Sequence, residues 1–345
     1  MVLLVISCPC ALLISIPLGY FAGIGSASRK GILIKGSNYI DEISRLNTVV
    51  FDKTGTLTKG TFRVTEIVSR NNFKEDEILK FAAYAESHSS HPIAVSIKEA
   101  YNRNINDSEI AKNEEVPGYG VKASALGHNI LAGNDKFLHI DNIEHEDCEI
   151  VKTVVYIAID KKYAGYIIIG DEEKPDAREA VASLKKLGIK TVSMFTGDST
   201  NVAQYYSNKL GIKSYYAELL PLEKLKKLKE LKSKKNKIAF VGDGINDAPV
   251  IAEADVGFAM GKLGTDAAIE TADVVLMTDA PSKVTEAIKI SKRTKRIVLE
   301  NILLVMIIKL LFIAFGAFGL SGMWEALFAD VGVTLLAVLN TLRLL

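Results

Sequence analysis

Asp52 stands at the start of a short polar loop, in surroundings that suit covalent chemistry. The run Thr48–Phe51 consists of β-branched and aromatic residues, and predicts a strand that ends at this aspartate. Residues 53–58 are rich in glycine and threonine, so that exposed backbone N–H groups can close around a phosphate. The loop therefore places Asp52 to attack phosphorus, although an isolated aspartate at a strand end is ordinarily a turn or cap residue.

Two further predicted strands also end in polar loops. Lys190–Phe195 is followed by residues 196–198, and Lys237–Val241 by residues 242–247. Strands and helices alternate through this part of the chain, which predicts a parallel sheet with crossover helices. Because open α/β sheets bind ligands at the carboxyl ends of their strands, these loops and Asp52 are expected to form one active site.

The charge of a phosphoryl group assigns roles to the polar side chains of these loops. Phosphoryl transfer concentrates negative charge, so that Mg²⁺ with hard oxygen ligands is expected. Asp243 is the best second carboxylate ligand beside Asp52, and the carbonyl of Thr54 is a third candidate. Thr196 can donate a hydrogen bond to a phosphoryl oxygen, and Lys224 supplies positive charge.

The complete string 52–58, Asp-Lys-Thr-Gly-Thr-Leu-Thr, resembles the phosphorylation motif of P-type ATPases. Thr-Gly-Asp at 196–198, Pro-x-x-Lys at 221–224 and Gly-Asp-Gly-x-Asn-Asp at 242–247 are similar to the remaining phosphorylation-domain motifs of that family. The resemblance implies a haloacid dehalogenase-like α/β domain and an aspartyl-phosphate intermediate. The catalytic residues it implies are Asp52, Lys53, Thr54, Thr196, Gly197, Asp198, Lys224, Asp243, Asn246 and Asp247.

Residues 61–168 differ in pattern and are predicted to be an α+β domain inserted into the phosphorylation domain, which comprises 45–60 and 169–285. Amphipathic helices are expected near 75–86 and 93–101, followed by strands punctuated by glycine. The connection 171–175 resembles the family's link between domains, with Lys174 where arginine is expected.

The insertion contains, in order, a Glu, a His-Pro, a Gly-x-Gly and a Gly-Asn, as in the nucleotide-binding domain of heavy-metal ATPases. The resemblance implies that these residues hold the adenine and ribose of ATP. They are Glu86, His91, Gly118, Gly120, Gly133 and Asn134. Glycine allows close backbone approach to a flat base, whereas a lone Gly-x-Gly would be weak evidence. The chain contains no GxxxxGK[ST] loop, which disfavours nucleotide binding of the P-loop kind.

Three apolar segments are long enough to cross a bilayer, at 1–25, 297–320 and 323–343. Basic residues follow the first segment and flank the other two, which predicts a cytoplasmic body and a multi-pass protein of the cell membrane. A signal peptide is the alternative for the first segment. No basic stretch precedes it, and Pro17 lies within it, so that a retained span is favoured.

The predicted spans carry polar residues that suit a metal ion. Pro9 breaks the helical hydrogen-bond ladder between Cys8 and Cys10, so that both thiols can turn to one point. Lys309 and Asp330 are costly charges inside the other two spans. The alternatives are that the cysteines are small packing residues and that Lys309 and Asp330 merely pair with each other.

Cys-Pro-Cys resembles the intramembrane metal site of heavy-metal P-type ATPases, and the Lys and Asp-x-Gly pattern resembles their zinc, cadmium and lead subgroup. Two thiolates and a carboxylate suit Zn²⁺, Cd²⁺ or Pb²⁺ better than Cu⁺. Cys8, Cys10 and Asp330 are therefore the expected ligands, with Lys309 as the balancing charge of the empty site. The sequence does not rank the three metals.

Composition excludes some other functions. The net charge of +1 gives no electrostatic case for nucleic acid. The chain has three cysteines, which do not make a disulfide framework, and Cys148 is expected to be a bystander. The lysine-rich run 224–237 is predicted to be an amphipathic helix with one apolar stripe formed by Leu222, Leu225, Leu228 and Leu231.

The resemblance covers the carboxy-terminal part of the family's length, and no Thr-Gly-Glu loop of an actuator domain is found. We expect ATP-driven export of a divalent metal, with a second polypeptide as a candidate supplier of the actuator. The alternatives are a membrane-anchored haloacid dehalogenase-like phosphohydrolase and a non-transporting fragment that binds nucleotide or metal. Dependence of turnover on ATP and Zn²⁺ distinguishes the first two.

Overall fold

The computed structural model describes residues 10–116, 118–145, 153–232, 236–243, 247–261, 266–318 and 322–345. They form two compact units. The first, here called the core unit, combines the chain up to Leu57 with Lys174–Leu345, and the second, the inserted unit, is Thr58–Glu173. The predicted insertion at 61–168 lies within the second unit, and the predicted domain boundaries themselves stay predictions.

The core unit contains a sheet with the strand order β1-β13-β12-β11-β2-β9-β10. All neighbouring pairs are parallel except β1 with β13. The strands are β1 (Ile32–Ile34), β2 (Thr48–Asp52), β9 (Thr191–Phe195), β10 (Ser214–Tyr216), β11 (Ile238–Gly242), β12 (Val256–Met260) and β13 (Val274–Leu276).

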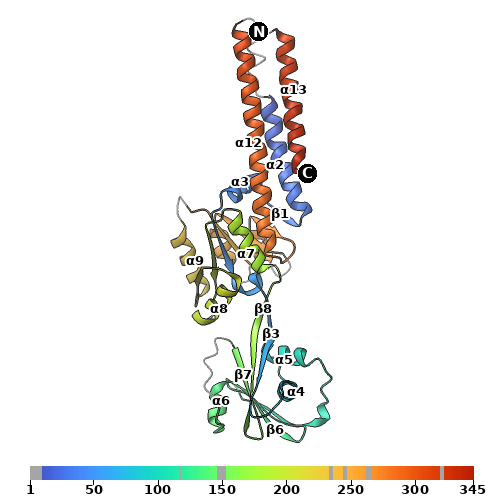
Figure 1. The fold of residues 1–345 in the computed structure, drawn as a ribbon, viewed down its shortest axis with the longest axis vertical. Coiled ribbons are helices and arrows are strands. Elements are labelled where there is room, and N and C mark those ends of the chain that lie inside the picture. Colours follow the sequence, from blue (N-terminus) through green and yellow to red (C-terminus); the bar gives the residue numbers. More distant parts are fainter. Residues whose placement is uncertain are drawn as a thin grey trace. The chain divides into compact units, whose positions relative to one another are not determined.

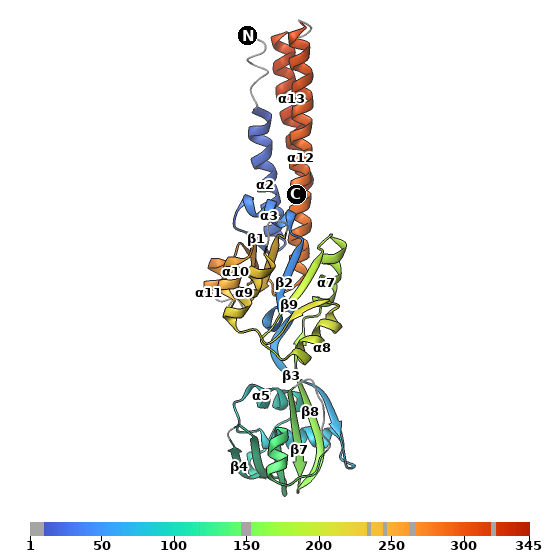
Figure 2. The ribbon, with the colours of Figure 1, turned by 90° about the vertical axis from the view of Figure 1, so that its left-hand side faces the viewer.

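Helices cover both faces of this sheet, as Figure 2 shows for α7 and α8 on one side and α9 and α10 on the other. Along β2, Val49 and Phe51 pack toward α7 and α8, while Val50 packs toward α9 and α10. Burial on both faces explains why these strands are continuously apolar. The helices are α3 (Ser37–Arg45), α7 (Ala177–Lys186), α8 (Thr200–Leu210), α9 (Pro221–Leu231), α10 (Ala248–Glu253) and α11 (Asp266–Thr271).

Helix α9 is amphipathic, but its predicted leucine stripe is wrong at one end. Leu228 is fully buried, and Leu225 and Leu231 pack against the same cluster, whereas Leu222 is 80% exposed. A spacing of three residues falls short of the 3.6 residues of a helical turn, so that each step drifts by about 60° around the helix. Leu222 is therefore carried away from the face on which Leu231 lies.

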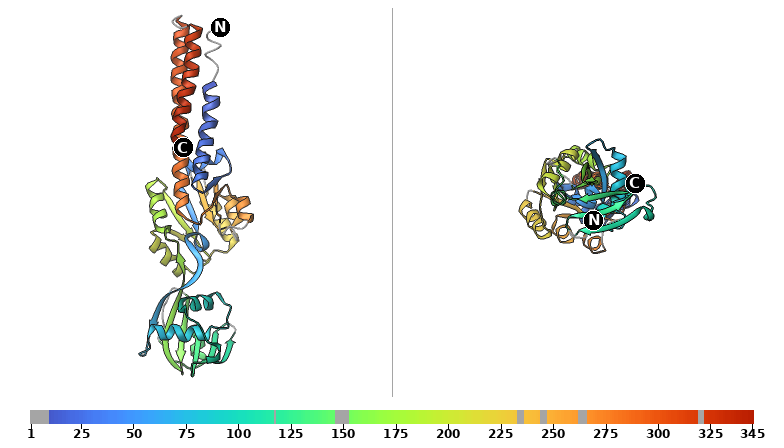
Figure 3. Two further views of the ribbon diagram at one scale, coloured as in Figure 1. Left: turned by 90° about the vertical axis from the view of Figure 1, so that its right-hand side faces the viewer. Right: turned by 90° about the horizontal axis from the view of Figure 1, so that it is seen from below.

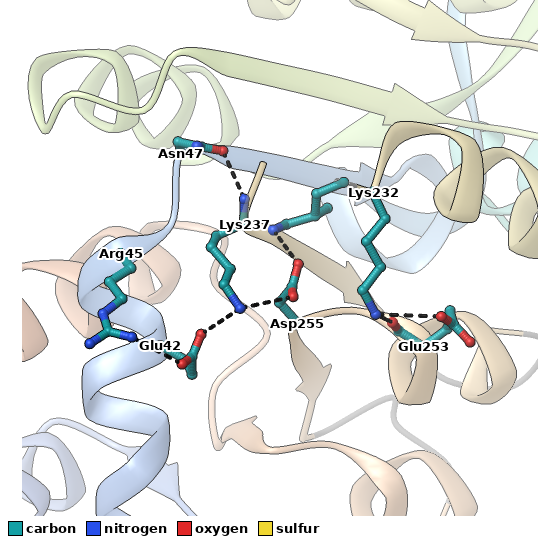
Figure 4. Close-up of polar contacts among 8 residues, drawn as sticks. Glu42, Arg45, Asn47, Lys232, Lys237, Glu253 and Asp255 are labelled. Atoms are coloured by element: carbon teal, nitrogen blue, oxygen red, sulfur yellow. Dashed lines mark hydrogen bonds and ion pairs between the residues drawn. The ribbon is translucent and has the colours of Figure 1, made fainter. Parts of the chain in front are cut away.

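A polar network lies at the amino ends of β2 and β11 (Figure 4). The Nζ of Lys237 lies 3.0 Å from Glu42 Oε2 and 3.3 Å from Asp255 Oδ1. The backbone N–H of Lys237 donates to Asn47 Oδ1 at 3.1 Å, and that of Ile238 donates to Asp255 Oδ2 at 2.9 Å. These contacts satisfy backbone groups where the strands begin.

Three long helices of the core unit lie side by side, α2 (Cys10–Arg29), α12 (Ser282–Ala317) and α13 (Met323–Thr341) (Figures 1 and 3). Among the described residues, α2 and α12 contain segments that are long and apolar enough to cross a membrane. A short 3₁₀ turn, η3 (Leu342–Leu344), follows α13. The third predicted span, 323–343, stays a prediction.

The helix boundaries differ from the predicted ends of the spans. Helix α12 begins at Ser282 rather than near residue 297, because its first turns pack Val284, Ala287 and Ile288 into the core of the sheet domain. Helix α2 likewise continues to Arg29, and Ala27 joins the same core. Both helices therefore run without a break from the apolar segment into the sheet layers.

The inserted unit is an antiparallel sheet of order β3-β8-β7-β6-β5-β4. Helices α4 (Glu75–Ala85) and α5 (Pro92–Tyr101) pack on one face, and α6 (Asp135–Ile140) packs on the other. The strands are β3 (Thr58–Ser69), β4 (Ile110–Val116), β5 (Gly120–Ala125), β6 (His128–Gly133), β7 (Thr153–Ile159) and β8 (Lys162–Glu173), and the 3₁₀ turn is η2 (Asp107–Glu109).

Candidate active site

Asp52 ends β2 and is nearly buried, with 5% of the residue exposed. Lys224, on the first turn of α9, places its Nζ 2.5 Å from Asp52 Oδ1 and 2.9 Å from Asp247 Oδ1. Asp247 precedes α10, after the loop that follows β11. One ammonium group is thus shared by two buried carboxylates from separate elements.

Burial raises the pKa of Asp52 to about 7, and the negative charge of Asp247 adds to this effect. Lys224 opposes the shift by its positive charge and its hydrogen bond. The pKa of Lys224 is itself raised: burial lowers it, but the attraction of Asp52 and Asp247 outweighs burial. The site therefore holds a carboxylate whose negative charge is only partly compensated.

Lys53 follows Asp52 and is also buried. Its Nζ lies 2.7 Å from Asp198 Oδ2 and 5.1 Å from the centre of the Tyr206 ring. The Thr196 hydroxyl donates to Asp198 Oδ2 at 2.9 Å and accepts from the Asp198 N–H at 3.1 Å. The loop after β9 is therefore tied to the loop after β2. No sequence motif pointed to Tyr206.

Gly55 gives the loop after β2 a turn that other residues adopt poorly, with φ of +73°. A Cβ atom at Gly55 would lie 2.5 Å from Asp243 Oδ2, so that the carboxylate of Asp243 packs directly on this loop. The negative charge of Asp243 also acts on Asp52. Thr54, which lies between Asp52 and Gly55 in the chain, is exposed and has extended backbone angles.

The donor set fits the Mg²⁺ that the resemblance implies. Asp52, Asp243 and Asp247 bring three carboxylates to one edge of the sheet, and Lys224 contacts two of them. Hard oxygen donors with uncompensated negative charge are what Mg²⁺ prefers. The hydroxyl of Thr56 is buried without a hydrogen-bond partner, which leaves a donor for an incoming oxygen atom. Asn246 lies outside the described residues, and Gly197 lies in the loop after β9.

Lys174 is a buried contact of the loop that sequence reasoning did not assign. Its Nζ donates to the carbonyl oxygen of Gly55 at 2.6 Å, and its N–H donates to the carbonyl of Leu57 at 3.0 Å. The only sequence feature that drew attention to this position was a lysine where the family resemblance predicts arginine. The lysine holds the loop by a hydrogen bond with a charged donor.

In the inserted unit, the six predicted nucleotide-binding residues line one pocket of about 330 Å³. Tyr119 and residues of α5, β4, β5 and β7 also line it. The predicted residues it contains are Glu86, His91, Gly118, Gly120, Gly133 and Asn134. Residues that are separated in the chain thus meet at one concave surface of the size that suits a small ligand.

Two polar side chains of this pocket differ in setting. Glu86, just after α4, is 7% exposed, and burial raises its pKa to about 7, with the charge of Glu115 adding to the shift and Lys98 opposing it. His91 is exposed and caps α5, its Nδ1 accepting from the N–H of Ile93 at 3.3 Å. The ordinary helix-start role of His91 therefore coexists with its place in the pocket.

Glycine occupies two positions of the pocket for different physical reasons. At Gly118, with φ of +81°, an added Cβ would meet nothing within 4 Å, so that the space beside it is open. At Gly120 an added Cβ would lie 2.2 Å from the carbonyl oxygen of Ala132. Gly120 is thus required by the close pairing of β5 and β6, independently of any ligand.

Among the helices α2, α12 and α13, Lys309 and Asp330 pair with each other. Lys309 Nζ lies 3.1 Å from Asp330 Oδ1, and both side chains are largely buried. Cys10 is the first residue of α2. Cys8 lies outside the described residues, so that the predicted pair of thiolates, Cys8 and Cys10, stays a prediction. Cys148 also lies outside the described residues. Asn301 Nδ2 donates to the carbonyl of Ala337 and to Thr341 Oγ1, each at 3.1 Å, and joins α12 to α13.

Residues 46–255 match the family model described as haloacid dehalogenase-like hydrolase, and the chain belongs to that family. Over its whole length it is 58% identical to a zinc-transporting ATPase of Synechocystis sp. and 53% identical to a cadmium, zinc and cobalt-transporting ATPase of Bacillus subtilis. It covers 48% and 50% of those proteins, so the chain spans about half the length of the curated relatives it matches.

The fold is also similar to a solved structure of a zinc-transporting PIB-type ATPase in its E2.Pi state. The TM-score is 0.86 at 34% sequence identity, covering 98% of this chain and 56% of the other. The predicted resemblance to P-type ATPases of the zinc and cadmium type is thereby confirmed, as is the haloacid dehalogenase-like fold class.

Proposed function

We propose that this chain forms the catalytic core of an ATP-driven exporter of a divalent metal ion, working through an aspartyl phosphate on Asp52. The observation that carries the proposal is the setting of Asp52. Its carboxylate ends a central strand, is almost buried, and is held at 2.5 Å by Lys224 where the loops after three parallel strands meet. The match of this whole chain to about half the length of metal-transporting ATPases supports it.

In the proposed reaction, an Oδ atom of Asp52 attacks the γ-phosphorus of ATP. The bond to the β,γ-bridging oxygen breaks, and ADP leaves with the electron pair. Lys224 and Thr196 offer donors to the equatorial phosphoryl oxygens, and Lys53 holds phosphate charge while anchored by Asp198. Water later hydrolyses the acyl phosphate to give Asp52 and inorganic phosphate.

Mg²⁺, when bound, would neutralise the charge that develops on the phosphoryl oxygens. The residues proposed to hold it are Asp52, Asp243 and the carbonyl of Thr54. The proposed placement of Asp243 is supported by its contact with the Gly55 loop. Asp247 remains paired with Lys224 and limits the movement of that lysine. Asn246 and Gly197 complete the proposed catalytic set.

ATP is proposed to bind with its adenine and ribose in the pocket of the inserted unit. Glu86 and His91 offer hydrogen bonds, and the open space beside Gly118 admits a flat base. Gly120, Gly133 and Asn134 shape the wall of the pocket. An uncharged or ionised Glu86 presents different hydrogen-bonding groups, so its raised pKa makes this wall sensitive to pH near neutrality.

The proposed cargo is Zn²⁺ or Cd²⁺, with Pb²⁺ as a third ion of similar ligand preference. Cys8, Cys10 and Asp330 are the proposed ligands. The ion pair between Lys309 and Asp330 supports a role for the lysine as the charge that compensates the carboxylate when no cargo is bound. The cargo would displace Lys309 from Asp330, and return of the lysine would favour release of the ion.

We propose that the protein lies in the cell membrane, with the sheet of the core unit and the inserted unit in the cytoplasm. The apolar lengths of α2 and α12 support this, and α13 is proposed as a third span. Dephosphorylation in this proposal needs an actuator function, for which a second polypeptide is one candidate source. The membrane, ATP and the metal ion are the other proposed partners.

The test is phosphoprotein labelling of the purified chain in lipid nanodiscs. The chain is incubated with γ-³²P-labelled ATP and Mg²⁺, with Zn²⁺ present or chelated, and acid-stable, hydroxylamine-sensitive label is counted. Asp52→Asn is compared with Asp255→Asn, which alters a carboxylate in contact with a lysine at the opposite edge of the same sheet. We expect Zn²⁺-dependent label in the native chain and in Asp255→Asn, and none in Asp52→Asn.

Label that is unaffected by Asp52→Asn would refute the proposed nucleophile. Label that ignores Zn²⁺ while remaining dependent on Asp52 would favour a phosphohydrolase over a metal exporter. Because loss of Asp52 also removes a buried charge, circular dichroism spectra of both variants establish that the comparison is between folded proteins.

A further inference from the structure

Three side chains of types that bind metal ions meet in the inserted unit. Asp135 begins α6, His139 lies one turn later on the same helix, and His145 follows in the loop after it. One ligand atom from each lies within 4.8 Å of the others. His145 Nε2 is 2.6 Å from Asp135 Oδ1, and His139 Nε2 is 3.5 Å from Asp135 Oδ2.

The hydrogen bonds of His145 favour a cation at this cluster. Its Nδ1 lies 3.1 Å from the carbonyl oxygen of Ile143, which only accepts, so we assign the ring proton to Nδ1. In the neutral ring, Nε2 then presents a lone pair to the carboxylate of Asp135 at 2.6 Å. Two acceptors at this distance repel unless a second proton or a metal ion lies between them.

The environment of His145 is that of a prepared ligand. Its side chain is 1% exposed and is enclosed by the rings of Tyr156 and Tyr163, whose centres lie 5.4 and 5.7 Å away. The contact with the Ile143 carbonyl fixes both the ring orientation and the nitrogen that is available for a metal. His139 and Asp135 are partly exposed, so an ion can enter from solvent.

We propose that Asp135, His139 and His145 form a further metal site, which binds a borderline divalent ion such as Zn²⁺. Two imidazoles and one carboxylate are typical Zn²⁺ ligands, and water would take the fourth position. Metal–ligand distances near 2.0–2.2 Å require ligand atoms somewhat over 3 Å apart. The pair of His139 with Asp135 already has this spacing, and that of His145 with Asp135 must open by less than about 1 Å.

The site would influence the nucleotide pocket through Asn134, a consequence that rests on the proposed function. Asn134 caps α6 by accepting from the N–H of Phe137 at 3.1 Å, and its Nδ2 donates to the carbonyl of Gly118 at 2.8 Å. The next residue is the ligand Asp135. A metal that ties Asp135 to His139 and His145 would therefore order α6 and, through Asn134, the wall of the pocket.

The test measures Co²⁺ binding by the visible absorption of tetrahedral Co²⁺, which can replace Zn²⁺. The full chain carries Cys8→Ser, Cys10→Ser and Asp330→Asn, so that the proposed cargo ligands do not contribute. His139→Ala removes one exposed ligand of the cluster. The matched control is His128→Ala, because His128 also contacts a carboxylate, with Nδ1 2.6 Å from Asp160 Oδ2.

We expect saturable absorption with one equivalent of Co²⁺, competed by Zn²⁺ and unchanged in His128→Ala. In His139→Ala the affinity should fall at least about tenfold, and Asp135→Asn should give a comparable loss. Absence of the band, or a Co²⁺ affinity unchanged by His139→Ala, would overturn the site. This readout needs no ATP, so that failure of the nucleotide proposal leaves it intact.

Coupling to nucleotide is measured separately with a fluorescent ATP analogue in the same background. Zn²⁺ is expected to tighten binding by roughly fivefold in the chain with an intact cluster, and not in His139→Ala. Metal binding without this shift would refute the coupling through Asn134, and the site itself would then stand on the Co²⁺ measurement.

Discussion

Two lysines at opposite edges of the core sheet each contact two carboxylates, and they differ chiefly in burial. Lys224 contacts Asp52 and Asp247, where all three side chains are at most 11% exposed. Lys237 contacts Glu42 and Asp255 at the amino ends of the strands, where the side chains are 35%, 29% and 13% exposed. The chemistry of the contacts is the same, whereas the access of water is not.

Comparison of the two lysines indicates that desolvation, more than ion pairing, sets the properties of the reactive carboxylate. Burial raises the pKa of Asp52 to about 7 although a lysine is in contact with it. At the solvated edge, hydrogen bonds with Glu42 and Asp255 raise the pKa of Lys237 and keep the group charged. Asp255 also accepts from the N–H of Ile238, which gives that edge a structural role.

The largest expected effect comes from breaking the buried group. Lys224→Met leaves Asp52 and Asp247 facing each other without a cation, and we expect a loss of about 3 kcal/mol in unfolding free energy. The rate of phosphoenzyme formation should fall at least about a hundredfold, because the donor to the phosphoryl oxygens is gone. Denaturant unfolding and rapid-quench labelling measure the two effects. Native-like stability would contradict the role assigned to burial.

Glu86, a buried carboxylate in the inserted unit, gives a second test of the effect of burial on a carboxylate pKa. Because its pKa rises from 4.5 to about 7 on folding, the folded state binds more protons between these values. Stability should therefore fall as pH rises from about 4.5 to 7, by on the order of 2–3 kcal/mol, and stay level above 7. Hydrogen exchange of β5 and β6 amides, corrected for intrinsic rates, reports this loss.

The matched variants for this measurement are Glu86→Gln and Glu75→Gln. Glutamine at 86 should abolish the change in protection between pH 4.5 and 7, because no proton is then gained on folding. Glu75 is exposed at the start of α4, and its replacement should leave the profile as in the native chain. A profile unchanged by Glu86→Gln would assign the pH dependence to another group.

Lys174 tests a buried lysine that contacts a carbonyl rather than a carboxylate. Lys174→Met leaves the Gly55 oxygen without this donor, and we expect a loss of about 2 kcal/mol in unfolding free energy. Phosphoenzyme formation should slow because the loop that carries Gly55 also positions Asp243. Lys174→Arg should recover most of both quantities, and failure of arginine to do so would argue against a simple donor role.

The smallest effect is expected from Lys237→Met at the solvated edge. A partly exposed ion pair contributes no more than about 1 kcal/mol, and added salt should reduce the difference further. Phosphoenzyme formation should be unchanged. A loss as large as that of Lys224→Met would erase the distinction between the two edges.

Much of the catalytic set could be predicted because its signals are local. The strand that ends in Asp52 and the glycine-rich loop after it can be identified from a few consecutive residues. The same holds for the loops at 196–198 and 242–247. Alternation of strands and helices then places these loops at one edge. The order of Glu86, His91 and the glycines indicated the pocket in the same way. The prediction for Leu222 was wrong because a spacing of three residues does not match the 3.6 residues of a helical turn.

Strand and loop preferences act over short distances, so these preferences alone predict which residues lie at the carboxyl edge of the sheet. The burial of Asp52 and its contact with Lys224 arise only in the folded chain, since Lys224 lies 172 residues away in the sequence and contacts Asp52 from α9. The same holds for the contact of Lys174 with Gly55 and for the cluster around His145. Desolvation and buried polar contacts depend on neighbours that only the folded chain brings together.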